Sequence, residues 1–136
     1  MICRIWRGWA TPQNAPLYEE IVRGEVIPEI EARRIPGFRA IDLMRRSLED
    51  AVEFVTIMWF DDINAVTAFV GEDYEAAHVP QRARDVLSRF DERSAHYEIS
   101  TTAISPPPDQ ARATTGVPRG GNSALRLRPT RAAARG

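Results

Sequence analysis

The chain has 136 residues, which is room for one folded domain with one hydrophobic core. Its single cysteine, Cys3, can form neither an internal disulfide nor a cysteine-rich metal cluster. The net charge of -1 hides an asymmetry: residues 1–100 hold 12 arginines against 18 acidic residues, whereas residues 101–136 hold six arginines against Asp109 alone. An acidic folded part argues against nucleic acid as its partner, because phosphate binding needs a basic face.

Several other classes of protein are also excluded by the sequence. No run of 18 apolar residues occurs, and Arg4 and Arg7 interrupt the apolar start, so we expect a soluble, cytoplasmic protein that does not contact membranes. There is no glycine-rich phosphate loop, no paired His-acid metal spacing and no nucleophile elbow with a Ser-His-Asp set. ATP, zinc and serine-hydrolase chemistry are therefore set aside.

The first part of the chain predicts a strand followed by a helix. Residues 2–9 interleave Ile, Trp and Cys with Arg and carry no helix signal, which indicates a strand. Thr11 and Pro12 then suit the cap and first position of a helix. Its apolar residues recur at spacings of three and four to about Glu31, and Pro28 is expected to kink it near its end.

Two further strands come next. Residues 35–37 (Ile-Pro-Gly) predict a turn, and residues 38–46 alternate polar and apolar side chains as a strand does. A polar turn over 47–50 leads into residues 52–60, the most β-prone run in the chain, with large apolar residues on both faces. This run is expected to be a central strand.

The last part of the domain predicts helix, helix and strand. Asp61 or Asp62 caps a short helix that ends at Gly71, and residues 74–78 add a further turn. Pro80 restarts the helix, and its apolar stripe is expected to comprise Ala83, Val86, Leu87 and Phe90. Residues 93–99 form the final strand.

The resulting order β-α-β-β-α-β predicts an α+β, ferredoxin-like domain over residues 1–100, with a four-stranded antiparallel sheet and helices on one face. From residue 101 the composition changes to proline, glycine and arginine with few large apolar residues. Nothing there offsets the entropy cost of ordering, so residues 101–136 are predicted to be a disordered tail.

Apolar side chains on both faces of the sheet predict a homodimer. Residues 55, 57 and 59 lie on the face opposite Phe54 and Met58, and Ile5 lies opposite Trp6. Burying a large apolar side chain stabilises by roughly 1.5 to 3 kcal/mol, so a second copy packed on the open face would recover a substantial amount. Two sheets face to face would also enclose a cavity in each half, which suits a small apolar ligand.

The run Phe54-Val-Thr-Ile-Met-Trp-Phe60, the aspartate-capped helix after it and the run Tyr74-Glu-Ala-Ala-His-Val-Pro80 resemble the antibiotic biosynthesis monooxygenase (ABM) family of dimeric α+β barrels. The likeness covers about residues 1–100. It implies a monooxygenase that acts on a small aromatic or polyketide-like metabolite and needs no cofactor or metal. Its substrate's own carbanion or radical would reduce oxygen, inside an apolar cavity with a base and oxyanion donors.

The resemblance also implies which residues form the site. The expected catalytic residues are His78, Tyr74 and Asn64, and the expected substrate-binding residues are Trp59, Phe69 and Trp6. The haem-degrading branch of the family has its axial His at about the position of His78, so haem binding through His78 stays open. That branch also has an Asn on the first strand and a Trp in the second helix, where this chain has Arg4 to Trp6 and Ala68-Phe69.

Each of these residues also has a structural interpretation. His78 and Asn64 could be surface or capping groups, Tyr74 could pack at the edge of the core, and Trp59 could be simple core. At most one of Arg4 and Arg7 can point into a cavity, since they lie on opposite faces of one strand. A non-catalytic, small-molecule-binding or regulatory dimer is therefore the alternative function.

Overall fold

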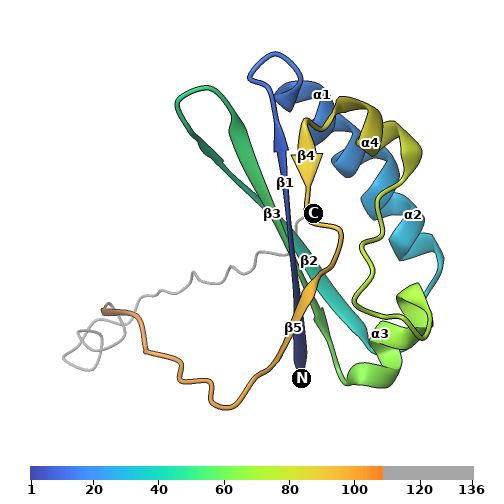
Figure 1. Cartoon of the computed structure of the whole chain (residues 1–136). Helices are drawn as coiled ribbons and strands as arrows, with labels where there is room; N and C mark the ends of the chain where they lie inside the picture. The colour runs from blue at the N-terminus through green and yellow to red at the C-terminus, as the bar shows by residue number, and fades with distance from the viewer. Residues whose placement is uncertain (109–136) are drawn as a thin grey trace. The chain divides into compact units, whose positions relative to one another are not determined.

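The computed structural model describes residues 1–108, and residues Met1–Ile99 form one compact unit (Figure 1). Of the tail expected from residue 101, residues 109–136 lie outside the described residues, and disorder there stays a prediction. The elements run in the order β1 (Ile2–Ala10), α1 (Ala15–Ile21), the π-helical η1 (Val22–Val26), α2 (Ile27–Ala32), β2 (Phe38–Ser47), β3 (Val52–Phe60), α3 (Ile63–Val70), α4 (Gln81–Val86), β4 (Arg89–Phe90) and β5 (Ala95–Glu98).

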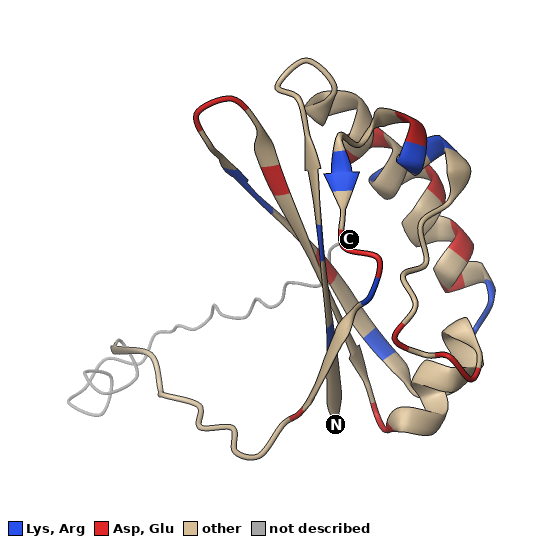
Figure 2. Cartoon of the chain, viewed as in Figure 1, with Lys and Arg blue, Asp and Glu red and all other residues tan. Residues whose placement is uncertain are grey.

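The sheet is antiparallel with the strand order β2-β3-β1, and both β4 and β5 pair with the remaining edge of β1. It therefore has five strands among the described residues and not the four expected, because two short strands share the position predicted for one strand over 93–99. The α+β, ferredoxin-like fold is thereby confirmed, and so is the interior position of β3. Within residues 1–99 the helices lie on one side of the sheet (Figure 1). Basic and acidic residues are interspersed over helices and strands (Figure 2). No helix within residues 1–108 is long and apolar enough to cross a membrane.

The register of β1 against β3 sorts their side chains between two faces. Ile2 lies opposite Phe60 and Gly8 opposite Phe54, so the even-numbered residues of both strands face the helices. Phe54 and Phe60 are fully buried there. The odd-numbered side chains, which include Ile57, lie on the face that no helix of the described chain covers.

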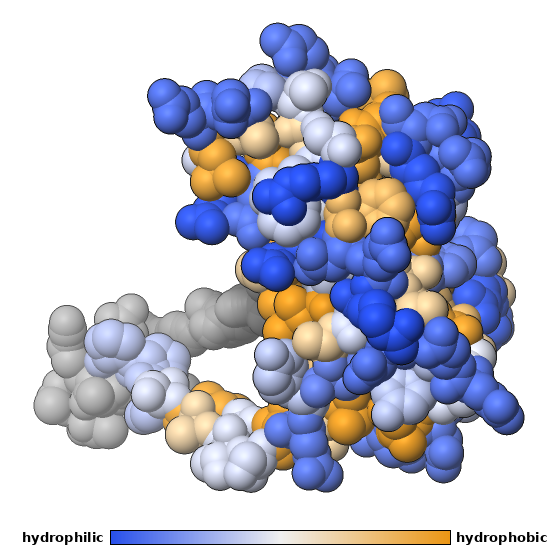
Figure 3. Space-filling model, viewed as in Figure 1, coloured by the Kyte–Doolittle hydropathy of each residue, from blue (hydrophilic) through white to orange (hydrophobic). Residues whose placement is uncertain are grey.

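This open face of the sheet is mostly apolar. Its large apolar members are Cys3, Ile5, Trp9, Met44, Val55, Ile57, Trp59, Tyr97 and Ile99. Tyr97 and Met44 leave 59% and 46% of their surface exposed. Elsewhere, too, apolar side chains reach a largely hydrophilic surface (Figure 3). The two-sided apolar sheet expected from the sequence is therefore present, and a second copy on this face stays a prediction.

The first helical run ends at Ala32, close to the expected Glu31, but it differs from expectation at its start and in its middle. It begins at Ala15 and not at Pro12, because Thr11 first closes a turn in which its hydroxyl oxygen accepts a hydrogen bond from the Asn14 N–H at 3.1 Å. Near Pro28 the helix widens into η1, where the Ile27 N–H donates to the Val22 carbonyl. A proline ring clashes with the carbonyl four residues earlier, and this widening in place of a simple kink makes room for it.

In the second half of the domain, the prediction of α3 is confirmed, whereas the predictions for the residues after α3 are partly wrong. Asp62 caps α3 by accepting a hydrogen bond from the Ala65 N–H at 3.0 Å, and the helix ends at Gly71 with a φ of 95°. The turn expected over 74–78 reaches only Glu75, and His78 lies in an irregular segment.

The helix after Pro80 is also shorter than its apolar stripe suggested. It ends at Val86, because the Ser88 N–H donates to the Trp9 carbonyl at 2.7 Å and draws the next residues to the edge of β1. Phe90, expected in the helix, therefore lies in β4 opposite Gly8, with its ring centroid 6.1 Å from that of Trp6.

Candidate active-site cavity

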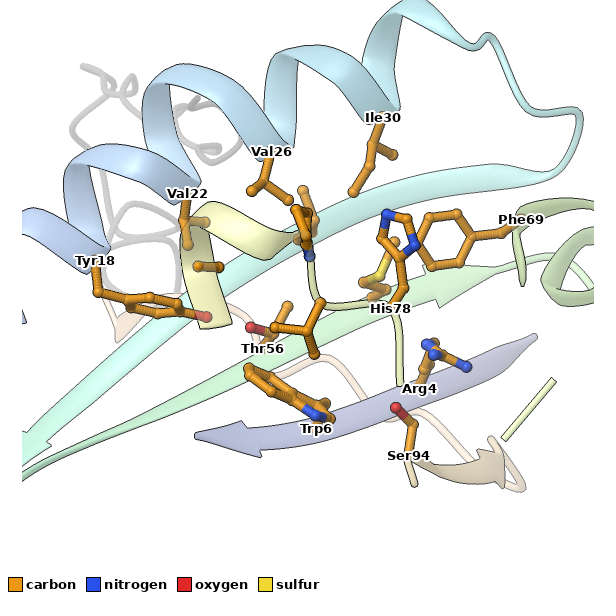
Figure 4. A pocket seen from close by; sticks show the side chains of 15 residues that line it. Arg4, Trp6, Tyr18, Val22, Val26, Ile30, Thr56, Phe69, His78 and Ser94 are labelled. Atoms are coloured by element: carbon orange, nitrogen blue, oxygen red, sulfur yellow. The ribbon is translucent and has the colours of Figure 1, made fainter. Parts of the chain in front are cut away.

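A cavity lies within the single chain, between the sheet and its own helices (Figure 4). The sequence led us to expect a cavity enclosed between the sheets of two copies. This cavity is formed by one copy alone and needs no second sheet. Its volume is about 50 Å³. The lining residues come from every layer of the domain: Arg4, Trp6, Tyr18, Val22, Val26, Ile30, Ile41, Thr56, Met58, Phe69, His78, Val79, Pro80, Ala83 and Ser94.

Most of the wall is apolar and firmly held. The indole N–H of Trp6 donates to the Asp91 carbonyl at 2.6 Å, which fixes the ring against one side of the cavity. Tyr18 packs its ring 4.7 Å from that of Phe54, and burial raises the pKa of its hydroxyl, so this group stays protonated at neutral pH. The walls thus offer aromatic surface with few competing charges.

His78 faces this cavity from the segment before α4 (Figure 4). Its ring meets Phe69 edge-on, with the centroids 5.1 Å apart. Burial is the main cause that lowers the pKa of His78, Arg33 and Arg4 lower it further, and Glu29 opposes them. The imidazole is therefore neutral at pH 7 and can accept a proton from a bound acid.

Arg4 enters the same cavity from β1 and is only 3% exposed. One terminal nitrogen, Nη1, donates to the Tyr74 carbonyl, and the other, Nη2, donates to the Ala76 carbonyl at 2.9 Å. Burial lowers the pKa of the guanidinium to about 10, so it still carries its charge at pH 7. The site therefore holds one buried positive charge beside a neutral imidazole.

Two further polar groups stand next to Arg4. The Nη1 of Arg4 lies 3.0 Å from Nε2 of His96, and Ser94, whose backbone N–H donates to the Glu75 carbonyl at 2.6 Å, lines the same cavity. Burial, followed by Arg4, lowers the pKa of His96, while Glu75 raises it. Neither Ser94 Oγ nor His96 Nδ1 has a hydrogen-bond partner within the described residues, although both atoms are buried.

An open hollow of about 390 Å³ adjoins the cavity on the helical side. The two spaces share His78, Val79, Pro80 and Val26, so these residues separate them. Drug-sized ligands usually occupy roughly 300 to 1,000 Å³, so the cavity alone takes only a small group. A larger ring system would need the segment 78–80 to move outward into the hollow.

The residues expected in the site separate into two groups. His78, Phe69 and Trp6 line the cavity. Tyr74 lies beside it, with its ring 5.2 Å from that of His96. Asn64 is exposed in the first turn of α3, outside the lining.

Trp59 lies on the open face of the sheet, because it pairs with Cys3 and not with a cavity residue. It therefore does not line this cavity, and a role for Trp59 in substrate binding stays a prediction. No sequence pattern marks Tyr18 or Ser94 as a cavity residue, and the sequence leaves open whether Arg4 or Arg7 points inward. Strand alternation alone places Arg4 and Arg7 on opposite faces of the sheet. Only the register of the strands shows which of these faces the helices cover.

Among residues 1–108, no three His, Cys, Asp or Glu side chains lie close enough together to hold a metal ion. Sequence comparison adds no identification: no protein-family model matches the chain, and no curated protein matches it at a significant level.

Solved structures do show the fold. A candidate antibiotic biosynthesis monooxygenase from Bacillus cereus matches with a TM-score of 0.55 and 13% identity, over 76% of this chain and 97% of that one. A monooxygenase from the gene ActVA-Orf6 of Streptomyces coelicolor, in complex with the ligand nanaomycin D, matches with a TM-score of 0.52 and 17% identity, over 78% and 92%. The heme-degrader MhuD of Mycobacterium tuberculosis, with two hemes in its active site, matches with a TM-score of 0.51 and 18% identity, over 76% of this chain and 100% of that one. The chain thus shares the fold of antibiotic biosynthesis monooxygenase structures.

Proposed function

We propose that the chain is a cofactor-independent monooxygenase that acts on a small aromatic or polyketide-like metabolite in the cavity between its sheet and helices, which such a ring system enters when residues 78–80 move outward into the adjoining hollow. The observation that carries this proposal is the pairing of aromatic, apolar walls with one neutral imidazole, His78, whose pKa is lowered by burial. The fold shared with monooxygenase structures supports it.

In the proposed reaction His78 takes a proton from a phenol or an activated CH₂ group of the substrate. The resulting carbanion reduces O₂ and forms a carbon–oxygen bond. Loss of water then leaves one oxygen atom on the substrate as a carbonyl and the other in the water, so a CH₂ group and O₂ become C=O and H₂O. The charge that develops on the substrate oxygen would lie in a cavity that already contains Arg4.

Haem, which one protein of the same fold binds, does not fit the cavity of this chain. The volume of about 50 Å³ is far below the space a porphyrin fills, and the Phe69 ring stands 5.1 Å from the His78 ring. We derive no step through haem.

Oxygen uptake tests the proposal. With a panel of anthrones and quinols, the wild-type chain should consume O₂, and His78→Gln should lower the rate at least about tenfold, since a positioned base contributes roughly 10²- to 10⁴-fold. The other two predicted catalytic residues are tested in the same assay. Both lie outside the lining, so Tyr74→Phe and Asn64→Ala should keep most of the rate. Equal rates for wild type and His78→Gln would remove the base from the mechanism.

The alternative function is a binding or regulatory module, and the small volume of the cavity favours it. Saturable binding of these compounds without oxygen uptake, under the same conditions, would establish this alternative in place of the enzyme.

A further inference from the structure

The charge on Arg4 has no counter-charge in the structure. Each of Arg7, Arg23, Arg39, Arg45, Arg46, Arg82 and Arg93 forms an ion pair with an aspartate or glutamate. Arg4 is 3% exposed, yet within residues 1–108 it forms no ion pair at all. Two carbonyl oxygens, a histidine nitrogen and the Phe69 ring, whose centroid is 5.5 Å from the Arg4 Cζ, surround it, and all of these groups are neutral. A buried charge without an opposite charge is costly, so the site favours an anion.

The guanidinium of Arg4 also has N–H groups that donate to no acceptor within the described residues. A guanidinium carries five N–H groups in a fixed fork, and the contacts of Arg4 account for three. Because arginine only donates, Nε2 of His96 must be the acceptor in their 3.0 Å contact, and the proton of neutral His96 is then on Nδ1. That Nδ1–H has no partner within the described residues.

Ser94 adds a second unpaired donor. It is 4% exposed, its hydroxyl is buried without a partner in the described chain, and it lines the cavity. In the close-up, the Ser94 oxygen is directed to the side on which Arg4 lies (Figure 4). Buried hydroxyl groups nearly always have a hydrogen-bond partner, so the missing partner points to a bound group at this spot.

We propose that Arg4 and Ser94 form a subsite for a single anionic oxygen group of the ligand, a carboxylate or an ionised phenol, attached to an aromatic body. The guanidinium supplies the charge and the Ser94 hydroxyl a hydrogen bond, while Trp6 and Phe69 contact the ring. This deepens the proposed function, because it names the charge of the substrate that the cavity selects. Charge-assisted hydrogen bonds of this kind are about twice as strong as neutral ones.

Isothermal titration calorimetry with the full chain at pH 7.5 tests the subsite without requiring turnover. Benzoate and benzamide have nearly the same shape and differ in charge, so benzoate should bind at least about tenfold more tightly. 4-Nitrophenol, titrated above and below its own pKa, forms the second arm and shows whether an ionised phenol is also accepted. Equal affinities for benzoate and benzamide, or no binding of benzoate at millimolar concentration, would overturn the proposal.

Variants locate the preference. Ser94→Ala breaks no side-chain hydrogen bond that the structure contains, so it should fold normally and weaken benzoate binding several-fold while leaving benzamide unchanged. Arg4→Gln should abolish the preference. Arg7→Gln is the matched control, since Arg7 lies on the other face of the same strand and pairs with Asp91 at 3.1 Å, and it should behave as wild type. Unchanged selectivity in folded Ser94→Ala would contradict a role for its hydroxyl and overturn the two-residue subsite.

The two proposals can fail separately. Benzoate selectivity that depends on Arg4, without oxygen uptake on any substrate, retains the anion subsite and rejects the monooxygenase. Oxygenation of neutral and anionic substrates at equal rates retains the enzyme and rejects the subsite.

Discussion

His78 and Arg4 reach the same cavity from parts of the chain 74 positions apart, and the charge of Arg4 acts on the imidazole of His78. Arg4 is one of the charges that lower the pKa of His78, so the pair consists of a fixed cation and a neutral imidazole. Such a division suits a reaction in which one group takes a proton and the other stabilises the anion that forms.

The two histidines make stability depend on pH in a defined window. Burial lowers the pKa of both His78 and His96 in the folded state, so the unfolded chain binds more protons as the pH falls below about 6.5. Their contribution is fully present above that value and is lost as pH falls through the folded pKa. The melting temperature should therefore fall between pH 6.5 and pH 5.

A thermal melt series measures this dependence. His78→Gln and His96→Gln should each make the decline shallower. Asp61 and Asp73 also have lowered pKa values, but they change the stability only below their usual pKa of 3.8 and therefore do not contribute between pH 6.5 and pH 5. A melting temperature that rises on acidification from pH 6.5 to pH 5 would contradict the burial of the histidines.

At the scale of elements, the glycines at two junctions should respond differently to the same substitution. Gly37 has a φ of 87° and a Cβ built on it would lie 2.7 Å from the Ala65 Cβ, whereas Gly71 has a φ of 95° and nothing within 4 Å. Gly71→Ala therefore costs the backbone strain alone, about 1 kcal/mol or somewhat more. Gly37→Ala also pushes α3 away from β2.

Urea unfolding of the two variants checks this difference. The loss in unfolding free energy should be clearly larger for Gly37→Ala, by about 1 kcal/mol or more, as is usual for overpacking. Equal losses would mean that α3 moves away without cost and does not pack closely on the turn before β2.

The strands were predictable from the sequence because their signals are local and agree with one another. The run of β-branched and aromatic residues in 52–60 indicates an interior strand by composition alone, and the Asp62 cap and Gly71 stop bound α3. The errors arose where tertiary pairing overrides a local pattern. Phe90 continues the helical spacing of α4, yet the edge of β1 offers its segment hydrogen bonds that a longer helix would forgo.

The cavity was less predictable than the fold for the same physical reason. His78, Phe69 and Trp6 could be named in advance, and so could the alternation that separates Trp59 from Phe54 and Met58. Trp59 was nevertheless expected beside the cavity residues, because strand alternation gives two faces without saying which one the helices cover. The missing counter-charge of Arg4 depends on every neighbour in the folded domain, so no sequence pattern reveals it.

At the scale of the whole molecule, the two faces of the sheet serve different purposes in this account. One holds the cavity, and the other carries the half-buried Ile57 and its apolar neighbours, which we propose pack against a second copy. Sedimentation at micromolar concentration should give twice the mass of one chain. Ile57→Glu should give the mass of one chain with an unchanged circular dichroism spectrum, and Ile63→Glu, an exposed isoleucine on α3, should stay paired. A wild-type chain that sediments alone would reject the dimer.

The central claim is that an aromatic ligand binds on the helix-covered face, and two tryptophans on opposite faces can test it. Trp6 lines the cavity, whereas Trp59 lies on the open face. In ¹H–¹⁵N spectra of the full chain titrated with an anthrone, the indole N–H signal of Trp6 should shift and saturate while that of Trp59 stays in place. A saturable shift of Trp59 with Trp6 unmoved would place the ligand on the open face and contradict the account.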